Sequence, residues 1–184
     1  MKKVLITGAN SYIGDNLKKY LEENGKYAVD ILDMVDEKWR DCDFSNYKVV
    51  INVCAIVHRF DNPDESLYFK VNKDLALEIA LKAKSAKVKQ FIQLSTVGVY
   101  GIELGEMNSR MGFNPKTPYE RSKYEADLKL DEIRSDSFKV CVVRPPMIYG
   151  NGCKGNFPKL VKFALKTPAF PSRKNKRDMI YIDN

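Results

Sequence analysis

The sequence predicts an α/β protein in which a doubly wound parallel sheet carries helices on both faces. Short apolar runs rich in β-branched residues alternate along the chain with longer segments of helical spacing. The runs are apolar at nearly every position, which is typical of parallel strands that are buried on both faces. The helical segments between them provide the crossover connections that parallel pairing requires.

The expected strands occupy residues 4–7, 28–32, 49–53, 91–94 and 140–143, with a further short strand at 39–42. The first helix is expected at 12–23, because Ile13 and Leu17 share a face and Asn24–Gly25 is a typical C-terminal signal. Two more helices are expected at 66–86 and 118–133. The second begins at Pro118, a residue suited to a first helical turn.

The composition excludes several classes of protein. The chain has 184 residues, which is enough for one domain and part of a second. Hydrophobic residues make up 44% and charged residues 30%, a composition that excludes a disordered chain. No apolar run approaches the roughly 20 residues of a membrane helix, so we expect no membrane partner and a cytoplasmic location. The cysteines at 42, 54, 141 and 153 form no C-x-x-C pair, and the single histidine is His58. We therefore expect reduced thiols and no metal site.

Basic residues gather near the end of the chain. The formal net charge is +7, and residues 151–184 carry eight basic against two acidic side chains. The basic residues are Lys154, Lys159, Lys162, Lys166, Arg173, Lys174, Lys176 and Arg177. Such a segment attracts phosphates, on a nucleotide or on nucleic acid, or is simply a solvated end.

The turn between the first strand and the first helix predicts a nucleotide site. Residues 7–14 have the sequence T-G-A-N-S-Y-I-G. Glycine suits so tight a turn because a positive φ costs it nothing, and the free N–H groups at the helix start attract a pyrophosphate. Asp33, at the end of the second strand, is placed to accept hydrogen bonds from the adenosine ribose. Its carboxylate would repel a 2′-phosphate, which favours NAD over NADP.

Tyr119 and Lys123 lie one helical turn apart and therefore share a face. An ammonium beside a phenol lowers the phenol pKa from about 10, as a bound nicotinamide cation also would, so Tyr119 is a candidate base. Chance is the alternative, because a lysine-rich chain with ten tyrosines is expected to hold about one such pair. The hydroxyls of Ser95 and Thr96 follow a central strand, where they can bond a substrate oxygen or merely satisfy a local turn.

In order along the chain, these segments resemble the NAD-dependent epimerase/dehydratase family of extended short-chain dehydrogenases/reductases, which acts on nucleotide sugars. The family's glycine motif falls on residues 7–14 and its Y-x-x-x-K pair on Tyr119 and Lys123. Its H-x-A-A-like, S-[ST]-x-x-V-Y-G and R-P-x-x-x-Y-G segments fall on residues 52–55, 95–101 and 144–150.

The resemblance implies an enzyme with a Rossmann-type fold, NAD as cofactor and a nucleotide sugar, most simply a UDP-sugar, as substrate. It assigns catalysis to Thr96, Tyr119 and Lys123. It assigns cofactor binding to Gly8, Asn10, Ser11, Tyr12, Ile13, Gly14, Asp33, Asp43, Phe44, Val53, Cys54, Ala55, Asn72, Tyr119 and Lys123. Substrate binding falls on Asn156 and Arg177, which gives the basic end a phosphate partner in place of nucleic acid. Residues 1–150 then form the NAD-binding domain, and 151–184 begin an incomplete nucleotide-sugar region.

Three departures from the family pattern bear on function. Ser11 replaces a motif glycine and fits only with a negative φ, and Met147 replaces a sugar-contacting Asn of several epimerases, which leaves the sugar open. Family members are longer, so we expect these 184 residues to have an incomplete sugar pocket and to be inactive alone.

Family dehydratases place Asp-Glu after the catalytic Thr, where this chain has Val97–Gly98, and neither residue can move a proton. A 4-epimerase that oxidises sugar C4 transiently is therefore favoured. The alternatives are an NAD(P)H-dependent keto-sugar reductase of the same family and a non-catalytic nucleotide-binding protein.

The helix expected at 66–86 is apolar over more than one stripe between residues 74 and 83. Such a helix is buried on two sides. We expect one side to face the sheet and the other, with the helix of Tyr119 and Lys123, to form a homodimer. Burial beneath a later part of the same fold is the alternative.

Overall fold

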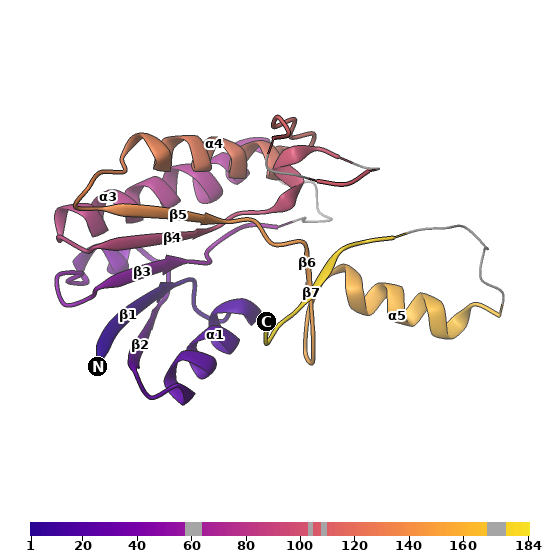
Figure 1. Cartoon of the computed structure of the whole chain (residues 1–184), viewed down its shortest axis with the longest axis horizontal. Coiled ribbons are helices and arrows are strands. Elements are labelled where there is room, and N and C mark those ends of the chain that lie inside the picture. The colour runs from indigo at the N-terminus through magenta and orange to yellow at the C-terminus, as the bar shows by residue number, and fades with distance from the viewer. Residues whose placement is uncertain (58–63, 103–104, 108–109, 169–175) are drawn as a thin grey trace.

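Five parallel strands form the central sheet of the computed structural model, which describes residues 1–57, 64–102, 105–107, 110–168 and 176–184. They are β1 (Lys2–Thr7), β2 (Tyr27–Leu32), β3 (Val49–Asn52), β4 (Gln90–Leu94) and β5 (Lys139–Val143). The order is β2-β1-β3-β4-β5, and all neighbours pair in parallel (Figure 1). The predicted doubly wound fold is thereby confirmed. The chain reverses its direction of winding at β1, between β2 and β3, which is where such sheets open a crevice for ligands.

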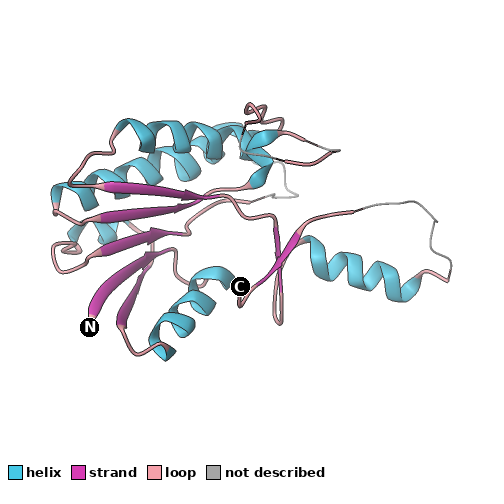
Figure 2. Cartoon of the chain, in the orientation of Figure 1, coloured by secondary structure: helices cyan, strands magenta, loops and turns pink. Residues whose placement is uncertain are grey.

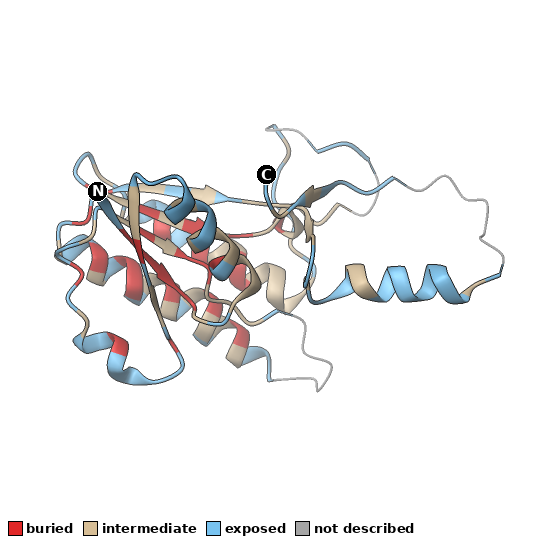
Figure 3. Ribbon diagram, turned by 90° about the horizontal axis from the view of Figure 1, so that it is seen from below, coloured by how far each residue is buried: buried red, intermediate tan, exposed pale blue. Residues whose placement is uncertain are grey.

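Helices cover both faces of this sheet (Figure 2). On one face Ile13 packs against Val4 and Ile6, and on the other Leu5 belongs to the cluster that contains Ile79. Neighbouring residues of β1 thus point to opposite, equally apolar sides, which explains the uninterrupted apolar run in the sequence. Figure 3 shows the buried residues concentrated in the sheet and in the helices lying on it. These helices are α1 (Tyr12–Glu23) on the first face, with α3 (Ala76–Ser85) and α4 (Pro118–Glu132) on the second.

Residues 39–42 do not form the expected strand, so that prediction was wrong. They lie mostly in η1 (Glu37–Asp41), a short 3-10 helix. The Asp36 side chain caps it by accepting a hydrogen bond from the Lys38 N–H at 3.1 Å. Trp39, 2% exposed, anchors the segment in the core. A cap and one buried aromatic hold this segment without a strand partner, so β2 is an edge of the sheet within the described residues.

The helix expected at 66–86 has an irregular middle. It runs as α2 (Glu65–Phe69), the π-helical segment η2 (Lys70–Leu75) and α3. The wider turn of a π-helix changes the direction of its side chains, and Asn72 inside it is fully buried. The helix expected at 118–133 is α4.

Three elements after β5 were not predicted: β6 (Met147–Tyr149), α5 (Asn156–Lys166) and β7 (Met179–Tyr181). β6 and β7 pair in parallel as a separate sheet, and with α5 they project beyond the carboxyl end of the main sheet (Figure 1). No residue of α5 is buried. His58, Arg173 and Lys174 lie outside the described residues. No helix in the described part of the chain is both long and apolar enough to cross a membrane.

Candidate active site

The glycine turn lies tightly against the segment that follows β3. Gly8 has a φ of +113°, and a Cβ added there would lie 2.9 Å from the backbone nitrogen of Cys54. A Cβ on Gly14 would lie 2.5 Å from Ser11 Oγ and 3.3 Å from Val53 Cγ2. Gly8 is therefore required by its backbone conformation and by its close approach to the Cys54 backbone, whereas a Cβ at Gly14 would displace the Ser11 hydroxyl. The turn stands at the winding reversal of the sheet.

Ser11 is the N-cap of α1. Its φ is −92°, as the sequence requires of a residue other than glycine, and its Oγ accepts a hydrogen bond from the Gly14 N–H at 3.0 Å. Asn10 before it adopts a left-handed φ of +60°. The N–H groups of Tyr12 and Ile13, at the start of α1, have no partner within the helix and remain available to an anion.

Three residues expected near the adenosine lie beyond β2. Asp33 is exposed, and its Oδ1 accepts from the Val35 N–H at 2.9 Å. Asp43 accepts from both the N–H and the hydroxyl of Ser45 at 2.8 Å, and these bonds hold the pKa of its carboxyl below the ordinary value. Phe44 is only 1% exposed and belongs to the core. Its side chain is therefore a packing residue, which leaves its main chain for any ligand contact.

Asn72 fastens the segment after β3. Its side chain accepts from the Ile56 N–H at 2.8 Å and donates to the Ile56 carbonyl at 3.0 Å and to Ser122 Oγ at 3.0 Å. The amide of Asn72 is thus occupied by the protein on both sides. It holds the segment that contains Val53, Cys54 and Ala55, and it ties this segment to α4.

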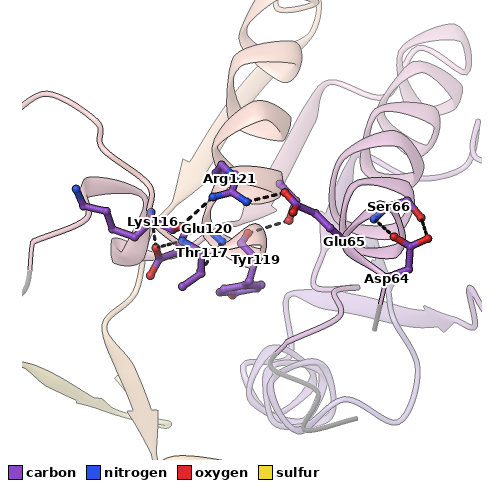
Figure 4. A network of polar contacts seen from close by, with 9 residues as sticks. Asp64, Glu65, Ser66, Lys116, Thr117, Tyr119, Glu120 and Arg121 are labelled. Carbon is purple, nitrogen blue, oxygen red and sulfur yellow. Dashed lines mark hydrogen bonds and ion pairs between the residues drawn. The ribbon is translucent and has the colours of Figure 1, made fainter. Parts of the chain in front are cut away.

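The first turn of α4 is set by its cap. Thr117 and Glu120 form a capping box, and Glu120 Oε2 also accepts from the Lys116 N–H at 2.8 Å. Arg121 donates to Glu65 Oε1 at 2.6 Å and to the Lys116 carbonyl at 2.9 Å, which joins α4 to the start of α2 (Figure 4). These contacts surround Tyr119 and fix where the helix begins.

Thr96 and Tyr119 meet between β4 and α4. Thr96 caps η3 (Val97–Tyr100), with its Oγ1 accepting from the Gly98 N–H at 3.1 Å. The Tyr119 phenol is hydrogen-bonded to the Thr96 side chain, and Lys123 lies one turn further along α4, only 2% exposed. Thr96 and Tyr119, two of the three residues predicted to carry catalysis, are thus brought together, and Lys123 follows them on the same helix. Ser95, the other candidate hydroxyl, instead donates to Asp127 at 2.9 Å.

Burial is the largest influence on the pKa values of Lys123 and Tyr119. It lowers the pKa of Lys123 to about 8, although the nearby Asp127 and Cys54 favour the ammonium. It raises the pKa of Tyr119 to about 12, and the Thr96 hydrogen bond offsets this only partly. The sequence predicted a lowered pKa for Tyr119, which is wrong for the chain without a ligand. The charges that act on the phenol are the carboxylates of Glu120 and Asp127, and both raise its pKa.

Sequence reasoning missed Asp127, although a signal for it was present. It is the third residue of the series Tyr119, Lys123 and Asp127 at one-turn spacing on α4. Asp127 is 4% exposed and accepts from Ser95 Oγ at 2.9 Å and from Arg144 Nε at 3.0 Å.

The residues expected to bind substrate lie on the projecting segment. Asn156 is the first residue of α5, Arg177 precedes β7, and both are exposed. Neither shares a hydrogen bond or ion pair with Thr96, Tyr119 or Lys123 within the described residues. Across the ranges that the structure describes, no group of three His, Cys, Asp or Glu side chains is placed to hold a metal ion.

The fold, the glycine turn and the Thr96–Tyr119–Lys123 group together define a dinucleotide-binding α/β protein. The model of the NAD dependent epimerase/dehydratase family matches residues 4–184, so the chain belongs to that family. The resemblance recognised in the motifs, and NAD as the cofactor of the family, are thereby confirmed.

Individual relatives agree with this assignment. The chain is 29% identical over 209 residues to a UDP-glucose 4-epimerase from Vibrio cholerae, covering 100% of the chain and 64% of that protein. It is 27% identical over 232 residues to a dTDP-D-glucose 4,6-dehydratase from Dictyostelium discoideum, covering 100% of the chain and 54% of that protein. The chain therefore spans between about half and two thirds of the length of these curated relatives.

A solved structure shows the same fold. A UDP-glucuronic acid 4-epimerase from Bacillus cereus in complex with NAD matches with a TM-score of 0.80 at 23% identity. The match covers 98% of this chain and 69% of that one.

Proposed function

We propose that this chain forms the cofactor-binding and catalytic part of an NAD-dependent nucleotide-sugar 4-epimerase. The observation that carries the proposal is the hydrogen-bonded Thr96–Tyr119 pair next to the buried Lys123, at the carboxyl edge of the sheet. This group is linked to the glycine turn through Cys54, which lies against Gly8 and acts electrostatically on Lys123. The similarity to a UDP-glucose 4-epimerase supports the same function.

The residues of this site fit NAD. Gly8 lets the turn pass close to the Cys54 backbone, where a Cβ would not fit, and α1 begins beside the turn with free N–H groups for a pyrophosphate. Asp33 would receive the adenosine ribose, with Asp43 toward the adenine. The buried ammonium of Lys123 has no hydrogen-bond or ion-pair partner within the described part of the chain, and the second ribose would supply one. When bound, NAD takes up a hydride from the reacting carbon and returns it.

The side chains of this chain handle the proton. Tyr119, as phenolate, would accept the proton of the sugar C4 hydroxyl, and Thr96 would hydrogen-bond the same oxygen. A base with a pKa of about 12 is poorly matched to neutral pH, so Tyr119 needs additional positive charge near it. The nicotinamide cation is the positive charge that the proposed complex would add to the ammonium of Lys123 already present on α4.

The surroundings of Thr96 favour an epimerase over a dehydratase, which must also move protons at the neighbouring carbons. Val97 and Gly98 follow Thr96 and carry no acid or base. Glu120 lies against Gly98, but its carboxylate accepts from the N–H groups of Lys116 and Thr117 at 2.8 and 2.9 Å. One of its oxygens, Oε2, therefore serves the helix cap.

Substrate binding and assembly complete the proposal. The diphosphate of a nucleotide sugar suits the basic end of the chain, with Asn156 and Arg177 as its ligands. A homodimer would use the outer face of α3 and α4, where Leu81 is 45% and Leu128 46% exposed although both are large and apolar.

Incubation of the native protein with NAD and UDP-glucose, UDP-N-acetylglucosamine or their 4-epimers tests the proposal. We expect the two epimers of one pair to interconvert with catalytic NAD and without added NADH. Tyr119→Phe should remove most turnover while NAD stays bound, and Tyr20→Phe, at an exposed position, should not. A requirement for stoichiometric NAD(P)H would identify a reductase instead.

A further inference from the structure

The buried carboxylate of Asp127 joins three elements behind the proposed catalytic group. Its Oδ2 accepts from Ser95 Oγ, next to β4, and from both Nε and a terminal nitrogen of Arg144, next to β5, at 2.9 to 3.0 Å. Its Oδ1 is buried and has no hydrogen-bond partner within the described residues. Asp127 itself belongs to α4, one turn after Lys123.

This arrangement controls where Thr96 lies. Ser95 directly precedes Thr96, and its N–H bonds the Val143 carbonyl at 2.7 Å, so β4 and β5 stay paired to their ends. Asp127 then fastens these paired ends to the helix that carries Tyr119. The Thr96–Tyr119 hydrogen bond therefore spans two elements whose separation Asp127 helps to set.

The charge of Asp127 acts on Lys123. The groups that influence the Lys123 ammonium are Asp127 on α4 and the Cys54 thiol after β3, with the Tyr119 phenol one turn away. Of these, only Asp127 is a carboxyl group, and it is paired with Arg144 at 3.0 Å. Burial raises the pKa of Asp127, but Arg144, Ser95 and Lys123 each favour its ionised form. Arg144 has no direct influence on Lys123 comparable to that of Asp127.

We propose that Asp127 is a positioning residue of this site. It holds the strand end that carries Thr96, and it supplies the negative charge that keeps the buried Lys123 side chain an ammonium ion at neutral pH. The role toward a bound cofactor rests on the proposed function, whereas the effect on Lys123 is a property of the chain alone.

Titration of Lys123 by NMR tests the charge directly. In protein labelled with ¹³C-lysine, the Lys123 ε-carbon resonance is assigned with Lys123→Arg and followed from pH 6 to 10. Asp127→Asn should move its midpoint down by about one pH unit or more, because the buried ammonium loses its counter-charge. Ser95→Ala removes a donor to the same carboxylate but no charge, so its midpoint should stay near that of the wild type. An unchanged midpoint in Asp127→Asn would overturn the proposal.

If Asp127→Asn does not fold, Arg144→Gln gives the answer. Removing the cation that competes for Asp127 should raise the Lys123 midpoint, and no movement would contradict the proposal.

Isothermal titration with NAD measures whether the charge of Lys123 affects cofactor binding. With a midpoint lowered by one pH unit, Asp127→Asn should lose about threefold in NAD affinity at pH 7.5 and recover most of it at pH 6, where Lys123 is protonated again. An equal loss at both pH values would indicate a structural role only. A wild-type chain that does not bind NAD would refute the proposed function, while the NMR titration would still decide the role of Asp127.

Discussion

Thr96 and Tyr119, from a strand end and a helix start, share a hydrogen bond at the carboxyl edge of the sheet. Both are fixed by independent local contacts, Thr96 by capping η3 and Tyr119 by the capping box of Thr117 and Glu120. The positions of both side chains are therefore set by contacts within the chain itself. A site organised in advance loses little entropy when substrate binds, which is what catalysis by orientation requires.

NAD should change the ionisation of Tyr119. The free chain holds the pKa of this phenol at about 12, and the nicotinamide cation would add a positive charge beside it, which favours the phenolate. We expect a new tyrosinate absorbance at 295 nm and pH 10 when NAD is added, present in the wild type and missing in Tyr119→Phe. An identical response of the two proteins would contradict this arrangement.

The buried ammonium of Lys123 should lower the free energy of unfolding of the chain. Its pKa falls from 10.5 to about 8, which corresponds to about 3 kcal/mol for a fully buried ammonium at neutral pH. Between these two values the unfolded chain binds more protons than the folded one, so the wild type should gain stability as the pH rises from 8 to 10.5.

Urea unfolding of Lys123→Met checks this prediction. The variant should exceed the wild type by up to about 3 kcal/mol at pH 7 and lose that advantage near pH 10. Lys19→Met, at a side chain 75% exposed, should leave the stability nearly unchanged at both pH values. A less stable Lys123→Met at pH 7 would mean that the ammonium is well solvated or paired.

Gly8→Ala should abolish NAD binding. Its positive φ strains any side chain by about 1–3 kcal/mol, and the added Cβ would also press against Cys54. Gly25→Ala is the matched control, since Gly25 has a φ of +70° but no atom within 4 Å of the added Cβ. Isothermal titration with NAD should show binding for Gly25→Ala and none for Gly8→Ala. Binding of NAD by both variants would mean that the glycine turn is not part of the cofactor site.

The proposed dimer face predicts a change of mass. Light scattering of the wild type should give twice the 21.1 kDa of one chain, and Leu81→Lys together with Leu128→Lys should give a single chain. Leu160→Lys, at an equally exposed leucine of α5, should leave the dimer intact. A monomeric wild type would argue against this interface.

The sequence predicted what depends on local pattern. Five strands, the first helix and the glycine turn follow from apolar runs, helical spacing and the need for a positive φ at Gly8. The strand expected at 39–42 failed because a buried Trp39 is equally compatible with a 3-10 helix that tertiary packing supports. The π-helical turn at Asn72 depends on bonds to Ile56, which is far away in sequence.

The pKa shifts of the site residues were harder to predict from the sequence. One-turn spacing indicated that Tyr119 and Lys123 share a face, but the sign of the Tyr119 pKa shift depends on how deeply both are buried. Burial at that depth is a property of the packed structure. Asp127 completes the same helical series, yet its importance appears only when Ser95 and Arg144 converge on it.

A crystal structure of the chain with NAD would show whether the cofactor reaches the Thr96–Tyr119 pair. We expect the pyrophosphate at the start of α1 and the nicotinamide ring beside Tyr119, with the adjoining ribose bonded to Lys123. NAD bound elsewhere, or with its nicotinamide turned away from Tyr119, would refute the proposed catalytic site.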